Sequence, residues 1–225
     1  MKRIRILLAD DHTIVREGLH ALLDADAGIE VVGEALDGRQ AVKMAKDLQP
    51  DIVVMDIAMP GLNGLEATRQ IHVAAPATKV LILSAHSDDA YIDRVIAVGA
   101  VGFVIKETSV QILANAIHKA MAGNTFYSPK VARRLREHYH RSDKDGGFLT
   151  KKPTGLTARE LEVIQLVAEG YANKQAAAEL KISIKTVEKH RQHLMDKLNI
   201  HDTVSLTRYA IEQGITESSL QITIV

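Results

Sequence analysis

Short apolar runs alternate with amphipathic stretches along the first half of the chain. The runs occupy residues 4–9, 29–35, 51–56, 79–84 and 101–106. The stretches between them repeat apolar residues at the three- and four-residue spacing of a helix that buries one face, and a fifth stretch ends at Gly123. Uninterrupted Val, Ile and Leu are typical of strands buried on both faces, as in a parallel sheet covered by helices. Residues 1–123 are therefore predicted to form an α/β domain, a doubly wound five-stranded parallel sheet.

The pattern changes after this domain. Residues 124–154 are predicted to be a linker that contains one helix, with Ser128 as its N-cap and Pro129 at its first position, followed by a Gly- and Lys-rich segment typical of flexible connections. Residues 155–216 are predicted to be an all-α domain, and residues 217–225 a C-terminal tail. Apolar spacing places the helices of the all-α domain at residues 158–169, 173–180, 184–198 and 203–213.

The composition mainly excludes certain kinds of site and segment. Cys is absent, which excludes disulfides and thiolate metal sites. The basic N-terminus precedes an apolar run, residues 6–9, that is too short for a signal peptide and ends at Asp10 and Asp11. No stretch approaches the roughly 20 apolar residues of a membrane span. We therefore expect a cytoplasmic protein without a membrane partner.

The formal net charge of zero combines two unlike halves. Residues 1–121 carry 12 Lys and Arg against 16 Asp and Glu, whereas residues 122–225 carry 16 against 12. A basic second half is a candidate partner of nucleic acid, although a chance fluctuation of this size is an alternative interpretation.

Polar residues follow the apolar runs at the carboxyl ends of the predicted strands, where open parallel sheets bind their ligands. These residues are Asp10, Asp11, Asp56, Ser84 and Lys106. Three carboxylates in one cleft repel each other unless a cation neutralises them, and oxygen ligands suit Mg²⁺. Asp56 is a candidate nucleophile because carboxylates form acyl-phosphates, and Lys106 and Ser84 would contact phosphoryl oxygens.

Each of these residues has a plainer interpretation when taken alone. Asp10 and Asp11 would cap the helix that opens near His12, Ser84 would be an ordinary polar strand end, and Lys106 a solvated lysine. Their common position at one sheet edge favours a site.

The motifs at this edge, "ADDH", "DIAMPGLNG", "SA" and "GAVGFVIK", resemble those of the receiver domain of two-component response regulators over residues 1–121. The resemblance implies a flavodoxin-like fold and a sensor histidine kinase that phosphorylates Asp56. It implies that Asp11, Asp56 and the backbone carbonyl of Ala58 hold Mg²⁺, and that Asp10 assists through water.

The same resemblance implies a switch pair, Ser84 and Phe103, which moves inward when a phosphoryl oxygen recruits the serine hydroxyl. Two departures from the usual pattern are Glu107, where many receivers have proline, and Phe103 itself, which lacks a phenolic hydroxyl. His86, two residues past the switch serine, and Ala58 flank the expected route of an attacking water.

The all-α domain contains a helix-turn-helix pattern, whose second helix enters the DNA major groove. Thr157 and Glu160 match a capping box, and Asn173 is expected to cap the next helix. The third helix, residues 184–198, has a charged face that alone would indicate only solvated surface. Its charged or titratable residues include Lys185, Lys189, His190, Arg191, His193 and Lys197.

Residues 155–215 resemble the LuxR-type DNA-binding domain, whose hallmark runs "LTxRExxVxxLxAxG…NKxxAxxL…SxxTVxxH…KL". The matching residues are Thr157, Arg159, Glu160, Gly170, Asn173, Lys174, Ser183, Thr186, Val187, His190, Lys197 and Leu198. A receiver joined to this domain is the architecture of the NarL/FixJ class of response regulators. The resemblance implies a phosphorylation-controlled transcription regulator that binds double-stranded DNA and forms a homodimer on phosphorylation or on DNA.

The geometry of that family places Glu188, Lys189 and Gln192 nearest the bases, and Lys185 and Thr186 nearer the backbone. Departures from the family pattern are Gln175 and Ala176, which are expected to weaken helix packing. Glu188 is a third, and is expected to reduce phosphate attraction.

Two other functions compete with this interpretation. A phosphatase of the haloacid dehalogenase type also uses a strand-end aspartate with Mg²⁺, but it would require D-x-D after the first strand, where this chain has adjacent aspartates. A regulator that acts without phosphorylation usually lacks an acidic pocket residue, and this chain keeps all of them. We expect no enzymatic activity apart from acceptance of the phosphoryl group and autodephosphorylation.

Overall fold

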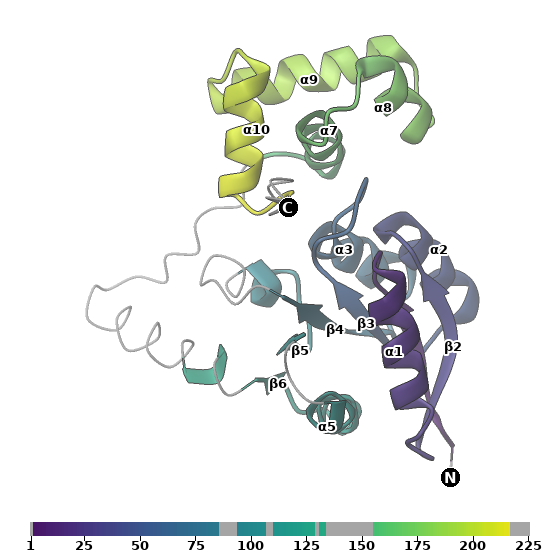
Figure 1. Ribbon diagram of the computed structural model, residues 1–225. Helices are drawn as coiled ribbons and strands as arrows, with labels where there is room; N and C mark the ends of the chain where they lie inside the picture. Colours follow the sequence, from purple (N-terminus) through teal and green to yellow (C-terminus); the bar gives the residue numbers. More distant parts are fainter. Residues whose placement is uncertain (1, 86–93, 107–109, 129–130, 134–154, 217–225) are drawn as a thin grey trace, which may run out of the picture. The chain divides into compact units, whose positions relative to one another are not determined.

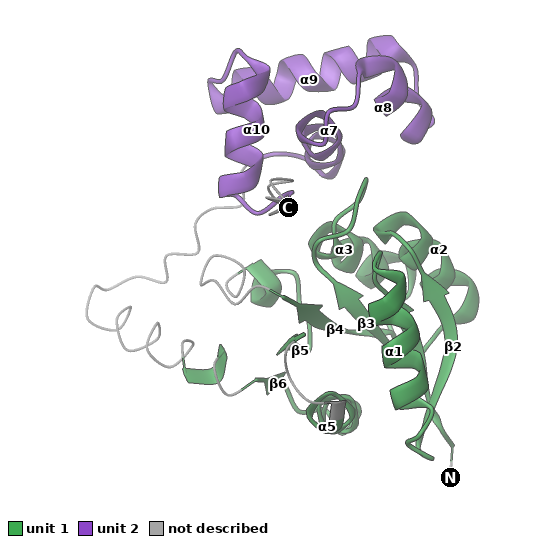
Figure 2. Ribbon diagram, in the orientation of Figure 1, with its two compact units in different colours: residues 1–150 green, residues 151–225 purple. Residues whose placement is uncertain are grey.

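The computed structural model describes residues 2–85, 94–106, 110–128, 131–133 and 155–216. The chain divides into two compact units, residues 1–150 and 151–225 (Figure 2). Residues 131–133 of the predicted linker helix are helical, and the N–H of Ala132 donates to the carbonyl of Ser128. The rest of that helix, from residue 134 on, the following linker segment and the predicted tail lie outside the described residues.

The first unit is built on a parallel sheet in the order β2-β1-β3-β4-β5-β6 (Figure 1). Its strands are β1 (Ile4–Ala9), β2 (Ile29–Ala35), β3 (Ile52–Asp56), β4 (Lys79–Ser84), β5 (Gly102–Ile105) and β6 (Phe126–Tyr127). The predicted α/β fold is confirmed. The sequence predicted five of these six strands, because the two residues of β6 are too few to show a periodic pattern.

Helices cover both faces of this sheet. They are α1 (Thr13–Leu23), α2 (Gly38–Leu48), α3 (Gly64–Ala74) and α5 (Val110–Met121). Residues 94–97, between β4 and β5, are also helical. One apolar core joins the sheet to α2 and α3, and the other joins it to α1 and α5. Alternate strand residues enter opposite cores, as Val53 and Val54 of β3 do, which explains the uninterrupted apolar runs.

Strand order reverses between β1 and β3, which places the crevice of the sheet at the carboxyl ends of these two strands. The loop after β3 is held there by buried apolar side chains, Ile57, Met59 and Leu62, each no more than 2% exposed. The side chain of Asn63 then caps α3 by accepting the N–H of Glu66 at 3.0 Å. Gly64, the first residue of α3, packs so closely on Asp56 that a Cβ would lie 1.9 Å from the Asp56 carbonyl oxygen.

The second unit is helical, with α7 (Ala158–Ala168), α8 (Asn173–Glu179), α9 (Ile184–Leu198) and α10 (Thr203–Glu212). Its own apolar core contains the fully buried side chains of Val163, Val187, Leu194 and Leu206. The predicted capping box is present: Thr157 and Glu160 exchange hydrogen bonds of 2.7 and 3.3 Å.

One expectation about α8 is wrong. Its N-cap is Ala172, not Asn173, which is the first helical residue. Gln175, at the third helical position, accepts the N–H of Ala172 at 2.8 Å with its Oε1, as in a capping box. Ala176 is fully buried in the core, where a small side chain fits.

Among the described residues, no helix combines the length and the apolar character needed to cross a bilayer.

Gly64→Ala is expected to lower the free energy of unfolding of the first unit by about 1–3 kcal/mol, because the new methyl group would overlap main-chain atoms of Asp56 and Ile57 at the end of β3. Urea denaturation followed by far-UV circular dichroism would measure this. Gly18→Ala is the matched control: it lies inside α1 with no atom within 4 Å of the added Cβ. Gly18→Ala should raise the free energy of unfolding by about 0.5–1 kcal/mol. Equal effects of the two substitutions would contradict the close packing of Gly64 on Asp56.

Candidate functional site

The predicted acidic residues meet at the carboxyl edge of the sheet. Asp56 is the last residue of β3, and Asp10 and Asp11 follow β1 directly. Asp10 and Asp56 are each 2% exposed. Ligand atoms of Asp10, Asp11, Asp56 and the unpredicted His12 all lie within 4.8 Å of one another. Four residues from two strand ends therefore form one cluster.

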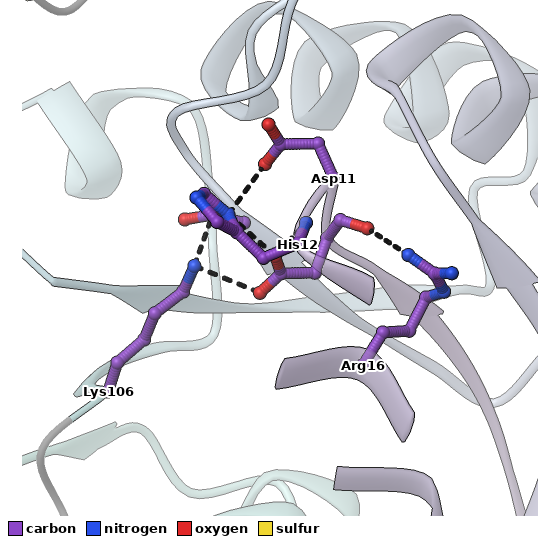
Figure 3. Close-up of polar contacts among 6 residues, drawn as sticks. Asp11, His12, Arg16 and Lys106 are labelled. Carbon is purple, nitrogen blue, oxygen red and sulfur yellow. Dashed lines mark hydrogen bonds and ion pairs between the residues drawn. The ribbon is translucent and has the colours of Figure 1, made fainter. Parts of the chain in front are cut away.

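Lys106 neutralises part of this cluster (Figure 3). Its Nζ lies 2.7 Å from Asp56 Oδ2 and 2.9 Å from Asp10 Oδ2. Burial raises the pKa of Asp56 above its ordinary value, although Lys106 opposes the shift. Burial alone would lower the pKa of Lys106, but Asp56 and Asp10 outweigh it and hold that pKa above the ordinary value. Lys106 is thus a fixed cation and not a solvated surface lysine.

His12 is the member that sequence reasoning missed. Its Nδ1 lies 3.2 Å from Asp10 Oδ1 and 3.0 Å from Asp11 Oδ1. It is also the N-cap residue of α1, without a side-chain capping bond, so neither aspartate caps this helix in its place. Asp10 Oδ1 instead accepts the N–H of His12 at 2.9 Å. The signal was present in "ADDH", where a histidine adjoins two aspartates.

The cluster fits a divalent cation. Three carboxylates carry a charge of −3 when ionised, and Lys106 offsets one of these charges. Asp11 Oδ1 is buried and makes no hydrogen bond among the described residues, and His12 Nδ1 lies 3.0 Å from it. Oxygen ligands with a residual charge of −2 are the chemistry that Mg²⁺ accepts.

The remaining predicted pocket residues occupy neighbouring positions. Ser84 ends β4 and is 2% exposed, and its carbonyl accepts the N–H of Lys106 at 2.8 Å. Ala58 lies two residues past Asp56, and its N–H hydrogen-bonds the Asp56 carboxylate. Phe103 of β5 is fully buried in the core, so its ring has no exposed starting position from which to move inward. His86 and Glu107 lie outside the described residues.

In the second unit, α9 separates a buried face from an exposed one. Val187 and Leu194 are fully buried, while Lys185, Lys189 and Gln192 are exposed at helical spacing on the other side. Glu188 is exposed beside them, and Thr186 is half-buried. Ser183 caps the helix by accepting the N–H of Thr186 at 3.1 Å, and the two hydroxyls are 2.7 Å apart.

An acidic residue that sequence reasoning did not single out adjoins the exposed face of α9. Asp196 Oδ1 accepts a 2.8 Å hydrogen bond from the Gln192 amide. Its position one turn beyond Gln192 was the available signal.

Two basic residues of α9 make contacts with other elements of the same unit. Arg191 donates to Asn173 Oδ1 at 3.2 Å and to Thr203 Oγ1 at 2.6 Å, and so ties α9 to α8 and α10. Lys197 Nζ lies 2.7 Å from Glu160 Oε2. Burial tends to raise the pKa of Glu160, but Lys197 and Thr157 outweigh it and hold that pKa below its ordinary value.

The chain matches two protein-family models, the response regulator receiver domain over residues 6–118 and the bacterial regulatory proteins of the luxR family over residues 154–210. It is 36% identical over 216 residues to the oxygen regulatory protein NreC of Staphylococcus carnosus, covering 95% of this chain and 100% of that one. It is 39% identical over 207 residues to the transcriptional regulatory protein LiaR of Bacillus subtilis, covering 92% and 96%.

Solved structures of RcsB, one of them from Salmonella enterica serovar Typhimurium, are similar along most of the chain. RcsB bound to the promoter rprA in the presence of the phosphomimetic BeF3⁻ superposes with a TM-score of 0.58 at 25% identity, covering 92% of this chain and 98% of that one. Two RcsB dimers bound to two parallel DNAs give a TM-score of 0.56 at 25% identity, with the same coverage.

Asp56→Asn is expected to stabilise the first unit at neutral pH. Because the pKa of Asp56 is raised in the folded state, its ionised form opposes folding above that pKa, and the effect is relieved as the pH falls. Lys106 keeps Asp10 as a partner in the variant. Urea denaturation should show a higher free energy of unfolding for the variant than for the wild type at pH 7. This difference should shrink as the pH falls to about 4, where the carboxyl group of the unfolded chain titrates. A variant less stable than the wild type at pH 7 would contradict this.

Proposed function

This chain belongs to the two-component response regulators of the NarL/FixJ class, and we propose that Asp56 is the residue through which phosphorylation controls its DNA-binding domain. The family consists of transcription regulators rather than enzymes. Its receiver domain implies a histidine kinase as partner, and its helix-turn-helix domain implies DNA. The observation that carries the assignment of Asp56 is the Lys106 ammonium within 2.7 Å of Asp56 and 2.9 Å of Asp10.

The phosphoryl step begins with an Asp56 carboxylate oxygen that attacks the phosphorus of a phosphohistidine. A new P–O bond forms, the P–N bond breaks, and the imidazole leaves with the electron pair. Lys106 contributes to both ends of this step: it favours the ionised nucleophile against the burial that raises its pKa, and it lies within reach of a phosphoryl oxygen. Asp11, Asp56 and the Ala58 carbonyl would hold Mg²⁺, with Asp10 assisting through water; when bound, Mg²⁺ offsets the added negative charge.

Ser84 and Phe103 are the proposed readout of phosphorylation. Asp56 is in register with Leu83 across the β3–β4 pairing, and Ser84 is the next residue and the last of β4, so the two strand ends lie side by side. Phe103 pairs with Ile82 on the other side of β4. Because the ring is already buried, the change on phosphorylation would be a repacking inside the core and not an entry from solvent.

The phosphorylated state would end by autodephosphorylation, in which water attacks the phosphorus, the P–O bond to Asp56 breaks and inorganic phosphate leaves. Ala58 has no side-chain polar group to orient that water. His86 is a candidate for orienting this water, on the basis of its sequence position alone.

For the second unit, we propose that α9 enters the major groove with its exposed face. Lys189, in the middle of that face, would donate to guanine O6 and N7, and Lys185, near the helix start, would meet phosphate. Glu188, Gln192 and Thr186 complete the proposed contact set. One helix-turn-helix buries little surface, so useful affinity would come from a homodimer on a two-fold site, formed on phosphorylation or on DNA.

A protein with this output must reach the chromosome, so we place it in the cytoplasm.

Incubation with acetyl phosphate and Mg²⁺ is expected to add one phosphoryl group to the wild type, and acetate leaves in exchange. Asp56→Asn should lose this adduct because an amide cannot form the acyl-phosphate. Intact-protein mass spectrometry measures it. Asp51→Asn is the matched control, since Asp51 precedes the opposite end of the same strand and accepts the N–H of Arg5 at 2.9 Å. A wild-type yield in Asp56→Asn would refute the assignment, as would loss of the adduct in Asp51→Asn.

Lys185→Ala should weaken binding to all DNA sequences and lower the salt slope of log K by about one, as expected for one lost phosphate contact. Lys189→Ala should weaken the free energy of binding by roughly 1–3 kcal/mol on the cognate site and by much less on random DNA. Binding isotherms at several salt concentrations, on a site selected from random DNA with the phosphorylated protein, measure both. Equal losses by Lys189→Ala on cognate and random DNA would remove Lys189 from base readout.

A further inference from the structure

Arg16 is a buried cation behind the acidic cluster whose function the phosphoryl step does not explain. It lies in the first turn of α1 and is 7% exposed. Its Nη1 donates to the main-chain carbonyl of Asp10 at 2.9 Å, the contact drawn in Figure 3. Its Nε donates to Glu34 Oε2 of β2 at 2.7 Å. A buried guanidinium is costly to place unless its charge and donors are paired, and both contacts satisfy that condition.

Glu34 is itself held in place. It is in register with Leu8 of β1, so it lies beside the strand that leads into Asp10. Its Oε1 lies 2.5 Å from His20 Nδ1. The hydrogen bond from His20, together with Arg16, holds the pKa of Glu34 below its ordinary value. Arg16 therefore has an ionised partner anchored in the sheet.

The contact of Arg16 completes the restraint on the main chain of Asp10. The N–H of Asp10 donates to Ala35 of β2 at 3.1 Å, and its carbonyl accepts from Arg16, so both polar groups of this peptide segment are fixed. The N–H of His12, the residue directly before α1, donates to Asp10 Oδ1. The turn that carries both aspartates is thus tied to β2 at one end and to α1 at the other.

We propose that Arg16, supported by Glu34, is a positioning residue for the cation site, which it preorganises by fixing the main chain of Asp10 and Asp11. This inference rests on the proposed function, in which those aspartates help hold Mg²⁺. The physical reason is the repulsion among three carboxylates at 4.8 Å or less, which would spread the turn apart before a cation binds. Groups that orient metal ligands from behind typically change metal affinity 10–100-fold when removed.

An arginine suits this position better than a lysine. Its planar fork donates in two directions at once, to a carbonyl of the turn and to a carboxylate of β2. A lysine offers one point of charge on a flexible chain. Arg16→Lys should therefore recover only part of the affinity that Arg16→Met loses.

The test measures cation binding directly on the full-length chain. Mn²⁺ serves as the probe by electron paramagnetic resonance, and Mg²⁺ is titrated to displace it. Arg16→Met should lower the affinity for both cations by about tenfold or more. The affinity of Arg16→Lys should lie between those of Arg16→Met and the wild type. Lys79→Met is the matched control: Lys79 is also a half-buried cation that donates to a main-chain carbonyl, that of Ala120 at 2.5 Å, but it starts β4 at the opposite edge of the sheet. It should lose stability and keep cation affinity.

Mn²⁺ and Mg²⁺ affinities of Arg16→Met within about twofold of the wild-type values would overturn the inference. An equal loss of cation affinity in Lys79→Met would overturn it as well. If circular dichroism shows that Arg16→Met does not fold, Arg16→Lys decides by the same twofold limit. A wild type that binds neither cation would overturn the cation site together with the inference. Phosphorylation of the Asp56→Asn variant would instead overturn the proposed acceptor, so the two failures are distinguishable.

Discussion

The ion pair between Lys106 and the carboxylates of Asp10 and Asp56 is the interaction on which the pocket depends. It joins the ends of β1, β3 and β5, three strands that are distant in the sequence. Without it, burial and mutual repulsion would protonate or separate the acids. With it, the pocket keeps Asp56 in an interior where a carboxylate is otherwise unfavourable, and leaves a negative charge for a cation to balance.

The doubly wound topology explains why this arrangement forms where it does. The reversal of strand order between β1 and β3 opens a crevice only at their carboxyl ends. Behind the crevice, the buried apolar residues Ile57, Met59 and Leu62 and the close packing of Gly64 hold the loop that follows Asp56. The polar edge is therefore supported by two apolar cores, one of which contains Phe103.

The helix-turn-helix unit divides its polar residues between two tasks. Arg191, Lys197 and Glu160 make internal hydrogen bonds and ion pairs that fix how α9 lies against α7, α8 and α10. Lys185 and Lys189 remain exposed on the opposite side. A basic helix is thus not a uniform DNA-binding surface, because part of its charge stabilises the unit that presents it.

Much of this was predictable from the sequence because the signals are local. Apolar runs and helical spacing indicated five strands, the covering helices and the all-α unit, and strand-end residues indicated Asp10, Asp11, Asp56, Ser84 and Lys106. Other features were not predictable, because they depend on which groups meet across the fold. β6 was too short for a pattern, and Gln175 was a mere departure until its contact with Ala172 was visible. Nothing in the spacing of Arg16 and Glu34 showed that they pair behind Asp10. Periodicity determines which faces are buried, whereas a polar contact between distant residues is decided only when the tertiary structure brings their atoms within hydrogen-bonding distance.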